Sequence, residues 1–161
     1  MAEGEFAQVT YHVEHGLKKS TADRSAMASD PDMYVMAVEA AVRAHDSEIL
    51  NKYLPLAEKT AARINHPLYQ AIVSRAHGVS HRLAGKSDEA ANHLAAALDE
   101  FRKLDAPWQI GRTLLELGEV ERHRGNNETA RGNYSEALEA FESIGAAPDA
   151  DRARNALEAL S

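Results

Sequence analysis

The stretch that decides the fold runs from Leu114 to Phe141, LLELGEVERHRGNNETARGNYSEALEAF. Its apolar residues recur at helical spacing on both sides of a Gly-Asn-Asn turn, which predicts two amphipathic helices joined into a hairpin. Gly118 lies in the middle of the first helix, although a glycine there costs about 1 kcal/mol relative to alanine. Gly78 stands forty residues earlier in a similar context, RAHGVSHRLAGKSDEAANHL. The glycine therefore belongs to a repeat.

The forty-residue period extends through most of the chain. Turn residues recur at His45-Asp46, Gly85-Lys86-Ser87 and Gly125-Asn126-Asn127, and proline-containing breaks follow each second helix. Such units bury their apolar faces by stacking, so we expect an all-α solenoid of antiparallel helical hairpins. The predicted helices span residues 31–44, 47–64, 68–84, 87–104, 108–124 and 127–144, with a capping helix over 149–160.

The chain is expected to divide into two parts at residue 30. Residues 1–29 begin with MAEGEF, which resembles a sequence left by cloning, and continue as a short helix over 6–17 and a polar linker. Residues 30–161 form the repeat domain, with units at about 31–66, 67–106 and 107–147. Short polar side chains favour helix N-caps, and the predicted caps are Asp30, Asp46, Ser87 and Asn127.

The third unit resembles a known family. The tetratricopeptide repeat pattern, W-x2-L-G-x2-Y followed by A-x3-F, is similar to the series Leu114, Leu117, Gly118, Gly125, Ala130, Tyr134 and Ala137. The second unit matches it less fully, and the first diverges most. The forty-residue period resembles the longer repeats of large bacterial signalling ATPases, cyclases and maltose-activator-type regulators. The resemblance implies a protein-binding repeat whose first helices line a concave face.

Small residues explain the repeated glycine. In such a hairpin Gly118 is expected to face Ala130 across the helix pair, and Gly78 to face Ala90. The close contact then outweighs the loss of helix propensity.

Composition excludes several classes of function. The 161 residues contain no cysteine, which rules out disulfides and favours a reducing, cytoplasmic setting. A formal charge of −7 argues against a nucleic-acid partner. No apolar run approaches the length of about 20 residues that spans a bilayer.

Histidine pairs are the candidate metal ligands. His77 and His81 lie four residues apart, a spacing that can bind zinc, but no glutamate completes an H-E-x-x-H motif. We favour a structural role for both, and simple exposure for His12 and His15. No nucleophile with an evident base and no phosphate-binding loop is present, so we expect neither catalysis, nor a cofactor, nor a metal.

The concave face implied by the resemblance predicts a binding site for a protein or peptide carrying acidic groups, since arginine suits carboxylates. The chaperone-binding clamp is absent, so a chaperone tail is not the expected partner. Alternatively, the arginines pair with Glu39, Glu116 and Glu119 inside the fold. Charge reversal at two of them, Arg82 and Arg112, is expected to weaken binding without changing the melting temperature. The predicted groove residues are Arg43, Arg75, Val79, Arg82, Arg112, Leu115, Glu119 and Arg122.

Three functional interpretations follow. The leading one is a non-catalytic scaffold that binds a protein segment, an identical chain included, through its groove or its open ends. The second is the sensory or oligomerisation arm of a larger ATPase, cyclase or transcription regulator. The third, a metal-dependent enzyme, depends on His77 and His81 alone.

Overall fold

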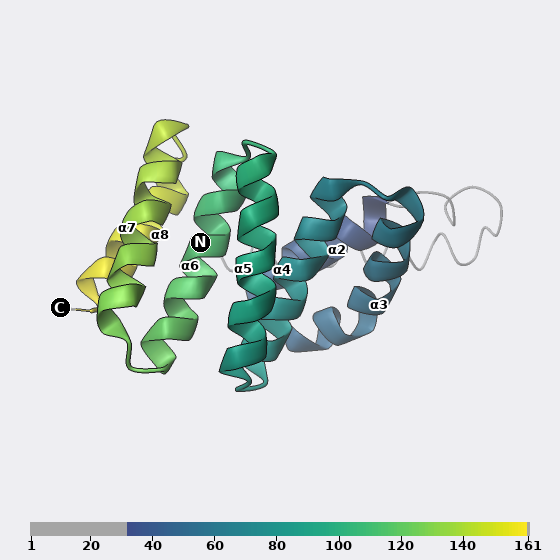
Figure 1. Ribbon diagram of the computed structural model, residues 1–161, viewed down its shortest axis with the longest axis horizontal. Coiled ribbons are helices and arrows are strands. Elements are labelled where there is room, and N and C mark those ends of the chain that lie inside the picture. The colour runs from purple at the N-terminus through teal and green to yellow at the C-terminus, as the bar shows by residue number, and fades with distance from the viewer. Residues whose placement is uncertain (1–31, 161) are drawn as a thin grey trace. The chain divides into compact units, whose positions relative to one another are not determined.

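The computed structural model describes residues 32–160, which form seven α-helices and contain no strand (Figure 1). Each helix boundary lies within two residues of the prediction from sequence, and the expected all-α fold of successive helical hairpins is confirmed. The predicted helix over 6–17, the linker and the Asp30 cap lie outside the described residues. The helices are α2 (Asp32–Ala44), α3 (Ser47–Ile64), α4 (Pro67–Leu83), α5 (Ser87–Lys103), α6 (Pro107–His123), α7 (Asn127–Ser143) and α8 (Ala147–Glu158).

One backbone device recurs at the helix ends and accounts for the period. A left-handed residue, with φ between 48° and 79°, stands at every twentieth position: His45, Asn65, Gly85, Asp105, Gly125 and Gly145. After α4, the N–H of residue 85 donates to the carbonyl of residue 82, and the N–H of residue 86 to that of residue 81. This pair of bonds is a Schellman motif. Glycine, asparagine, aspartate and histidine stand at these positions, and they are the residue types that best tolerate positive φ.

The N-caps differ between helices. The carboxylate of Asp46 accepts hydrogen bonds from the backbone N–H groups of Glu48 and Ile49, both at 3.0 Å, as predicted for the start of α3. The predicted caps Ser87 and Asn127 are wrong. Lys86 and Asn126 are the N-cap residues there, because their carbonyls accept the first helical hydrogen bonds. Neither residue makes a side-chain cap bond.

Residues 32–160 belong to two compact units whose boundary falls between Ala76 and His77, inside α4. The first, unit 1, contains α2, α3 and the beginning of α4. Its core residues Val38, Leu50 and Ala57 are fully buried between α2 and α3. Its α3 continues through Pro55, which lies on the exposed side of the helix.

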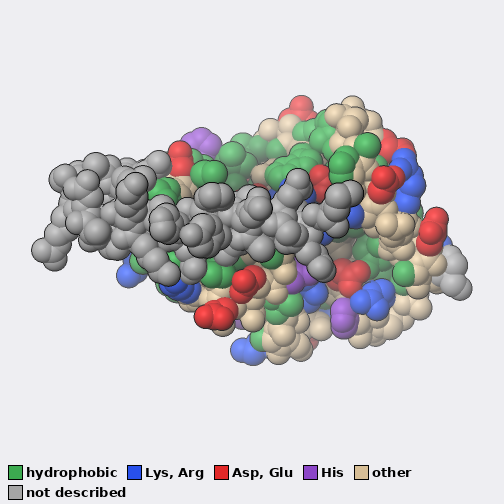
Figure 2. All heavy atoms as spheres, turned by 180° about the vertical axis from the view of Figure 1, so that it is seen from behind, with side chains coloured by type: hydrophobic (Ala, Val, Ile, Leu, Met, Phe, Trp, Pro, Cys, Tyr) green, Lys and Arg blue, Asp and Glu red, His purple; other side chains and the backbone are tan. Residues whose placement is uncertain are grey.

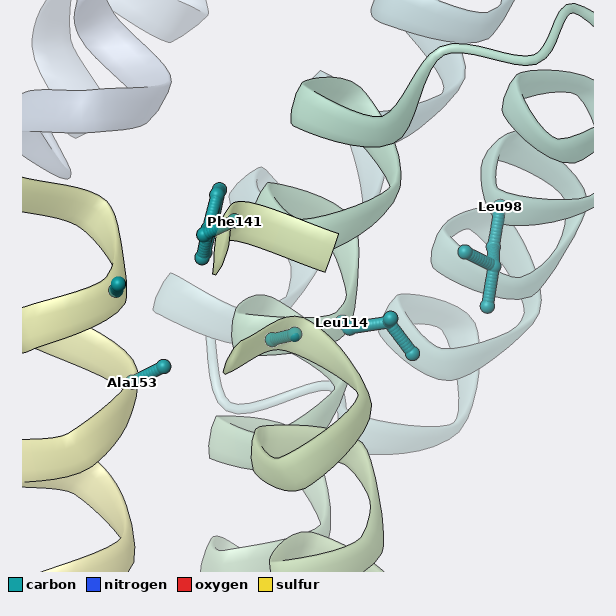
Figure 3. Close-up of a cluster of buried hydrophobic side chains, with 6 residues drawn as sticks. Leu98, Leu114, Phe141 and Ala153 are labelled. Atoms are coloured by element: carbon teal, nitrogen blue, oxygen red, sulfur yellow. The ribbon is translucent and has the colours of Figure 1, made fainter. Parts of the chain in front are cut away.

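The second unit, unit 2, contains the end of α4 and helices α5 to α8. Four successive helices contribute Leu98, Leu114, Phe141 and Ala153 to one buried hydrophobic cluster (Figure 3). The side of α8 away from this cluster is polar and exposed, at residues 151, 152, 154, 155 and 158. A polar outer face of this kind is what a terminal helix of a repeat needs. None of the helices between residues 32 and 160 has the length and apolarity needed to cross a bilayer.

The glycines of α6 make room for aromatic rings of α7. A Cβ atom on Gly118 would lie 2.1 Å from Cε1 of Tyr134, and one on Gly111 would lie 2.8 Å from the ring of Phe141. The two glycines and the two rings are each seven residues apart, as an antiparallel helix pair requires. Both rings are fully buried.

The expected glycine–alanine pairing is one part of the contact, and a large side chain of the next helix is the other. The nearest neighbours of Gly118 are ring atoms of Tyr134 rather than Ala130, although Ala130 is fully buried. A Cβ atom on Gly78 would lie 2.6 Å from Cγ of Leu94, and the nearest atom of Ala90 is its carbonyl oxygen at 3.1 Å. The glycines admit a large side chain of the next helix, in addition to allowing backbone approach.

Candidate partner-binding face

Within unit 2, the predicted groove residues gather on the first helices of the hairpins, α4 and α6. The first-helix face, as we call this surface, consists of Arg82, Leu83, Leu115, Glu116, Glu119, Arg122 and His123. Spacings of three and four residues place the members on α6 along one side of that helix. An ion pair between Arg82 and Glu116 joins α4 to α6.

The Arg82–Glu116 pair is largely shielded from water. The Nη2 and Nε atoms of Arg82 lie 2.8 Å and 3.1 Å from the same carboxylate oxygen of Glu116. Only 11% and 12% of the two side chains are exposed. Removing one partner of such a pair leaves a buried charge uncompensated, so Arg82 serves the packing of α4 against α6.

Glu119 organises a second, more exposed group of side chains. Its Oε2 accepts a hydrogen bond from Nη2 of Arg122 at 2.8 Å, and its Oε1 accepts one from the hydroxyl of Tyr134 at 2.6 Å. The exposed fractions of the Glu119 and Arg122 side chains are 30% and 43%. His123 contacts the backbone carbonyl of Glu119 through Nδ1.

The ionisation of this group follows from these contacts. Burial opposes the charged form of Glu119, but the hydrogen bonds from Arg122 and Tyr134 outweigh it and hold the pKa of Glu119 below its ordinary value. Burial and the bond to the carboxylate strongly raise the pKa of Tyr134. At neutral pH the carboxylate is therefore charged and the tyrosine retains its proton.

Arg112, also on α6, lies in a different environment beside Trp108. Its guanidinium stacks over the indole ring of Trp108, 4.6 Å from the ring centre, and only 6% of the residue is exposed. The indole N–H donates to the carboxylate of Asp149 at 2.9 Å. The expectation that charge reversal at Arg112 leaves the melting temperature unchanged conflicts with this burial.

The structure separates the eight predicted groove residues by exposure. Arg75 and Val79 are fully buried, Arg112 is nearly so, and Arg43, Arg82 and Leu115 are partly buried, whereas Glu119 and Arg122 reach solvent. In unit 1, Arg75 pairs with Glu39. The alternative interpretation, pairing with Glu39, Glu116 and Glu119, is thus confirmed for Arg75, Arg82 and Arg122.

One member of the site is not predicted by the sequence. Tyr134 belongs to the repeat pattern, and its hydroxyl reaches across to α6. A buried tyrosine usually finds a hydrogen-bond partner, and that was the available signal. Leu83, with 37% of its surface exposed, is the apolar residue beside Arg82. Figure 2 shows one side of the molecule, on which acidic and basic side chains are interspersed with hydrophobic ones.

The histidines form a stack. The ring of His93 on α5 lies 5.3 Å, centre to centre, from the rings of both His77 and His81 on α4, and the interplanar angles are 25° and 13°. His93 was not part of the sequence prediction. Among residues 32–160, no group of three or more histidine, aspartate or glutamate side chains is placed to hold a metal ion.

No family model and no curated protein matches the sequence. The fold is similar to that in the crystal structure of BtubC (BKLC) from P. vanneervenii, with a TM-score of 0.59 and 17% sequence identity. The similarity covers 99% of this chain and 73% of that one. At this identity the likeness concerns the fold alone, and it supports the helical-repeat class to which the hairpins belong.

Proposed function

We propose that the chain is a non-catalytic interaction scaffold, and that the first-helix face of unit 2 binds a segment of a protein or peptide. The proposal includes a tetratricopeptide-type repeat of the longer form, as the series from Leu114 to Ala137 indicates. The cysteine-free composition supports a cytoplasmic setting for this interaction.

Two features carry the proposal: an exposed leucine next to Arg82 on α4, and a preoriented, partly exposed ion pair on α6, the helix to which Arg82 is bound. Leu83 offers apolar surface, and the Glu119–Arg122 pair offers charged groups whose positions are set by hydrogen bonds. Binding sites for protein segments combine an apolar anchor with polar groups at its rim. Side chains that are already ordered lose less entropy when a partner binds.

A display library of random 16-residue peptides, selected on the immobilised full chain, tests the proposal. Leu83→Glu places a charge on the first-helix face and should abolish capture of the selected peptides. Leu104→Glu is the matched control, because Leu104 lies at the end of a second helix and is 38% exposed, against 37% for Leu83. This control should capture the same peptides as the wild type.

Circular dichroism melts of the three proteins establish that each is folded before the comparison. Failure to select any peptide on the wild type contradicts the scaffold proposal. Equal capture by the wild type and Leu83→Glu contradicts the assignment to this face.

A further inference from the structure

Two arginines of unit 2 pair with a glutamate at the same distance along the chain. Arg82 pairs with Glu116, thirty-four residues later on the next first helix. Arg102 pairs with Glu136, again thirty-four residues later, on the next second helix. The offset is the same because successive hairpins repeat every forty residues and place equivalent helices in the same register.

Arg122 pairs differently from Arg82. It stands forty residues after Arg82 and is therefore its equivalent in the third hairpin. The position thirty-four residues after Arg122 is Ala156, on α8, and alanine offers no carboxylate. Arg122 bonds instead to Glu119, one turn earlier on its own helix. The position on α8 that corresponds to Glu116 on α6 is thus an alanine, and it offers Arg122 no acidic side chain.

The guanidinium of Arg122 is nevertheless held in position. Glu119 anchors it from one side, and Glu119 is itself fixed by the hydroxyl of the fully buried Tyr134. A guanidinium has five N–H donors, and the described contacts of Arg122, with Glu119 and Tyr134, use at most two of them. With 43% of the side chain exposed, a carboxylate from outside can reach the remaining donors.

We propose that Arg122 receives a carboxylate of the bound segment, in the place where Glu116 meets Arg82. This inference rests on the proposed scaffold function and names the chemistry of its partner, an extended peptide segment with an aspartate or glutamate.

The test uses peptides selected on the wild-type chain and measures their affinity by fluorescence polarisation. Arg122→Gln should weaken binding about tenfold, since it removes a charge-assisted contact. The same loss should appear when the acid of the peptide is replaced by its amide, and the two changes together should cost no more than either alone. Arg102→Gln is the matched control: Arg102 is 45% exposed and already paired, so binding should be unchanged.

A second variant fills the vacant position from within the chain. Ala156→Glu offers Arg122 the acidic partner that Glu116 gives Arg82. It should weaken binding of the acidic peptides, and it should have no further effect in the Arg122→Gln background. Far-ultraviolet circular dichroism shows whether the variants keep their helices.

Each other result decides against the assignment. Selected peptides without acidic residues, or acidic peptides that bind Arg122→Gln as tightly as the wild type, overturn the role of Arg122 and leave the scaffold function standing. A library that yields no peptide at all overturns both.

Discussion

Single residues decide how tightly the hairpins of unit 2 close. The sequence predicts from the repeat that Gly118 is needed for a close helix pair, but it does not predict what fills the space. That depends on the register of α6 against α7, which brings Tyr134 rather than Ala130 to the glycine. Helix periodicity gives the buried side of each helix, whereas the register between two helices is a property of their packing.

Substituting Gly118 with alanine tests this contact. The new methyl group would lie 2.1 Å from the Tyr134 ring, which is fully buried and hydrogen-bonded and so resists displacement. We expect a loss of about 1–3 kcal/mol in the free energy of unfolding, measured by urea denaturation. Gly132→Ala, also inside a helix but with nothing within 4 Å, should instead stabilise by about 0.5–1 kcal/mol. Stabilisation by both substitutions contradicts the packing account.

Tyr134→Phe isolates the hydroxyl bond to Glu119. The bond lowers the pKa of Glu119, so its contribution to stability is present above the ordinary glutamate pKa of about 4.3 and is lost as the pH falls through the lower folded value. We expect a loss of about 1–2 kcal/mol at pH 7. The difference in stability between wild type and variant should shrink as the pH falls from 6 to 3.

Tyr134 has the opposite linkage at alkaline pH. Its pKa is raised on folding, so this contribution is present below the ordinary tyrosine pKa of about 10 and disappears as the pH rises through the folded value. At acid pH the test concerns Glu119. If the free energies of unfolding of the wild type and of Tyr134→Phe change in parallel from pH 3 to 8, the Tyr134 hydroxyl has no role in the ionisation of Glu119.

At the scale of elements, the turns were the most predictable feature and the caps the least. Glycine at 85 and 125 and proline near 67 and 107 mark the helix boundaries, and the structure agrees within two residues. The sequence does not reveal that His45 and Asp105 adopt the same left-handed conformation as the glycines, because both are also common inside helices. The Schellman turn then fixes where the next helix begins, which moves Ser87 from the cap position into α5.

Asp46 and Ser87 form a matched pair for testing the caps. Asp46→Ala removes the acceptor of two backbone N–H groups at the start of α3 and should destabilise the protein by about 1 kcal/mol. Ser87→Ala removes a side chain without a cap bond and should change stability by less than about 0.5 kcal/mol. Thermal melts compare the two, and equal effects would mean that the cap geometry is not as described.

At the scale of the whole chain, the sequence predicts which residues face the next helix. It does not predict which of these residues are buried or paired with that helix. The groove prediction does not distinguish between the arginines of the first helices. In the structure their roles differ with their neighbours: Arg75 is fully buried beside Glu39, Arg112 lies under an indole ring, and Arg122 remains accessible. Whether an arginine is buried or accessible depends on neighbouring residues, some of which lie on another helix. Those neighbours can be identified only when the register between the helices is known.

Substitutions of Arg112 and Arg122 should therefore differ in their effect on stability. Arg112→Glu replaces a nearly buried cation, stacked on Trp108, by a carboxylate on the side of α6 where Asp149 approaches the same indole. Uncompensated buried charge should lower the free energy of unfolding by about 3 kcal/mol or more. Arg122→Gln removes one exposed partner of an ion pair within one helix turn, where the loss should stay below about 1 kcal/mol. Urea denaturation of both variants gives the comparison. A small change in the free energy of unfolding of Arg112→Glu would contradict the structural role of this arginine. Arg112 would then be a candidate for the binding face, from which its burial now excludes it.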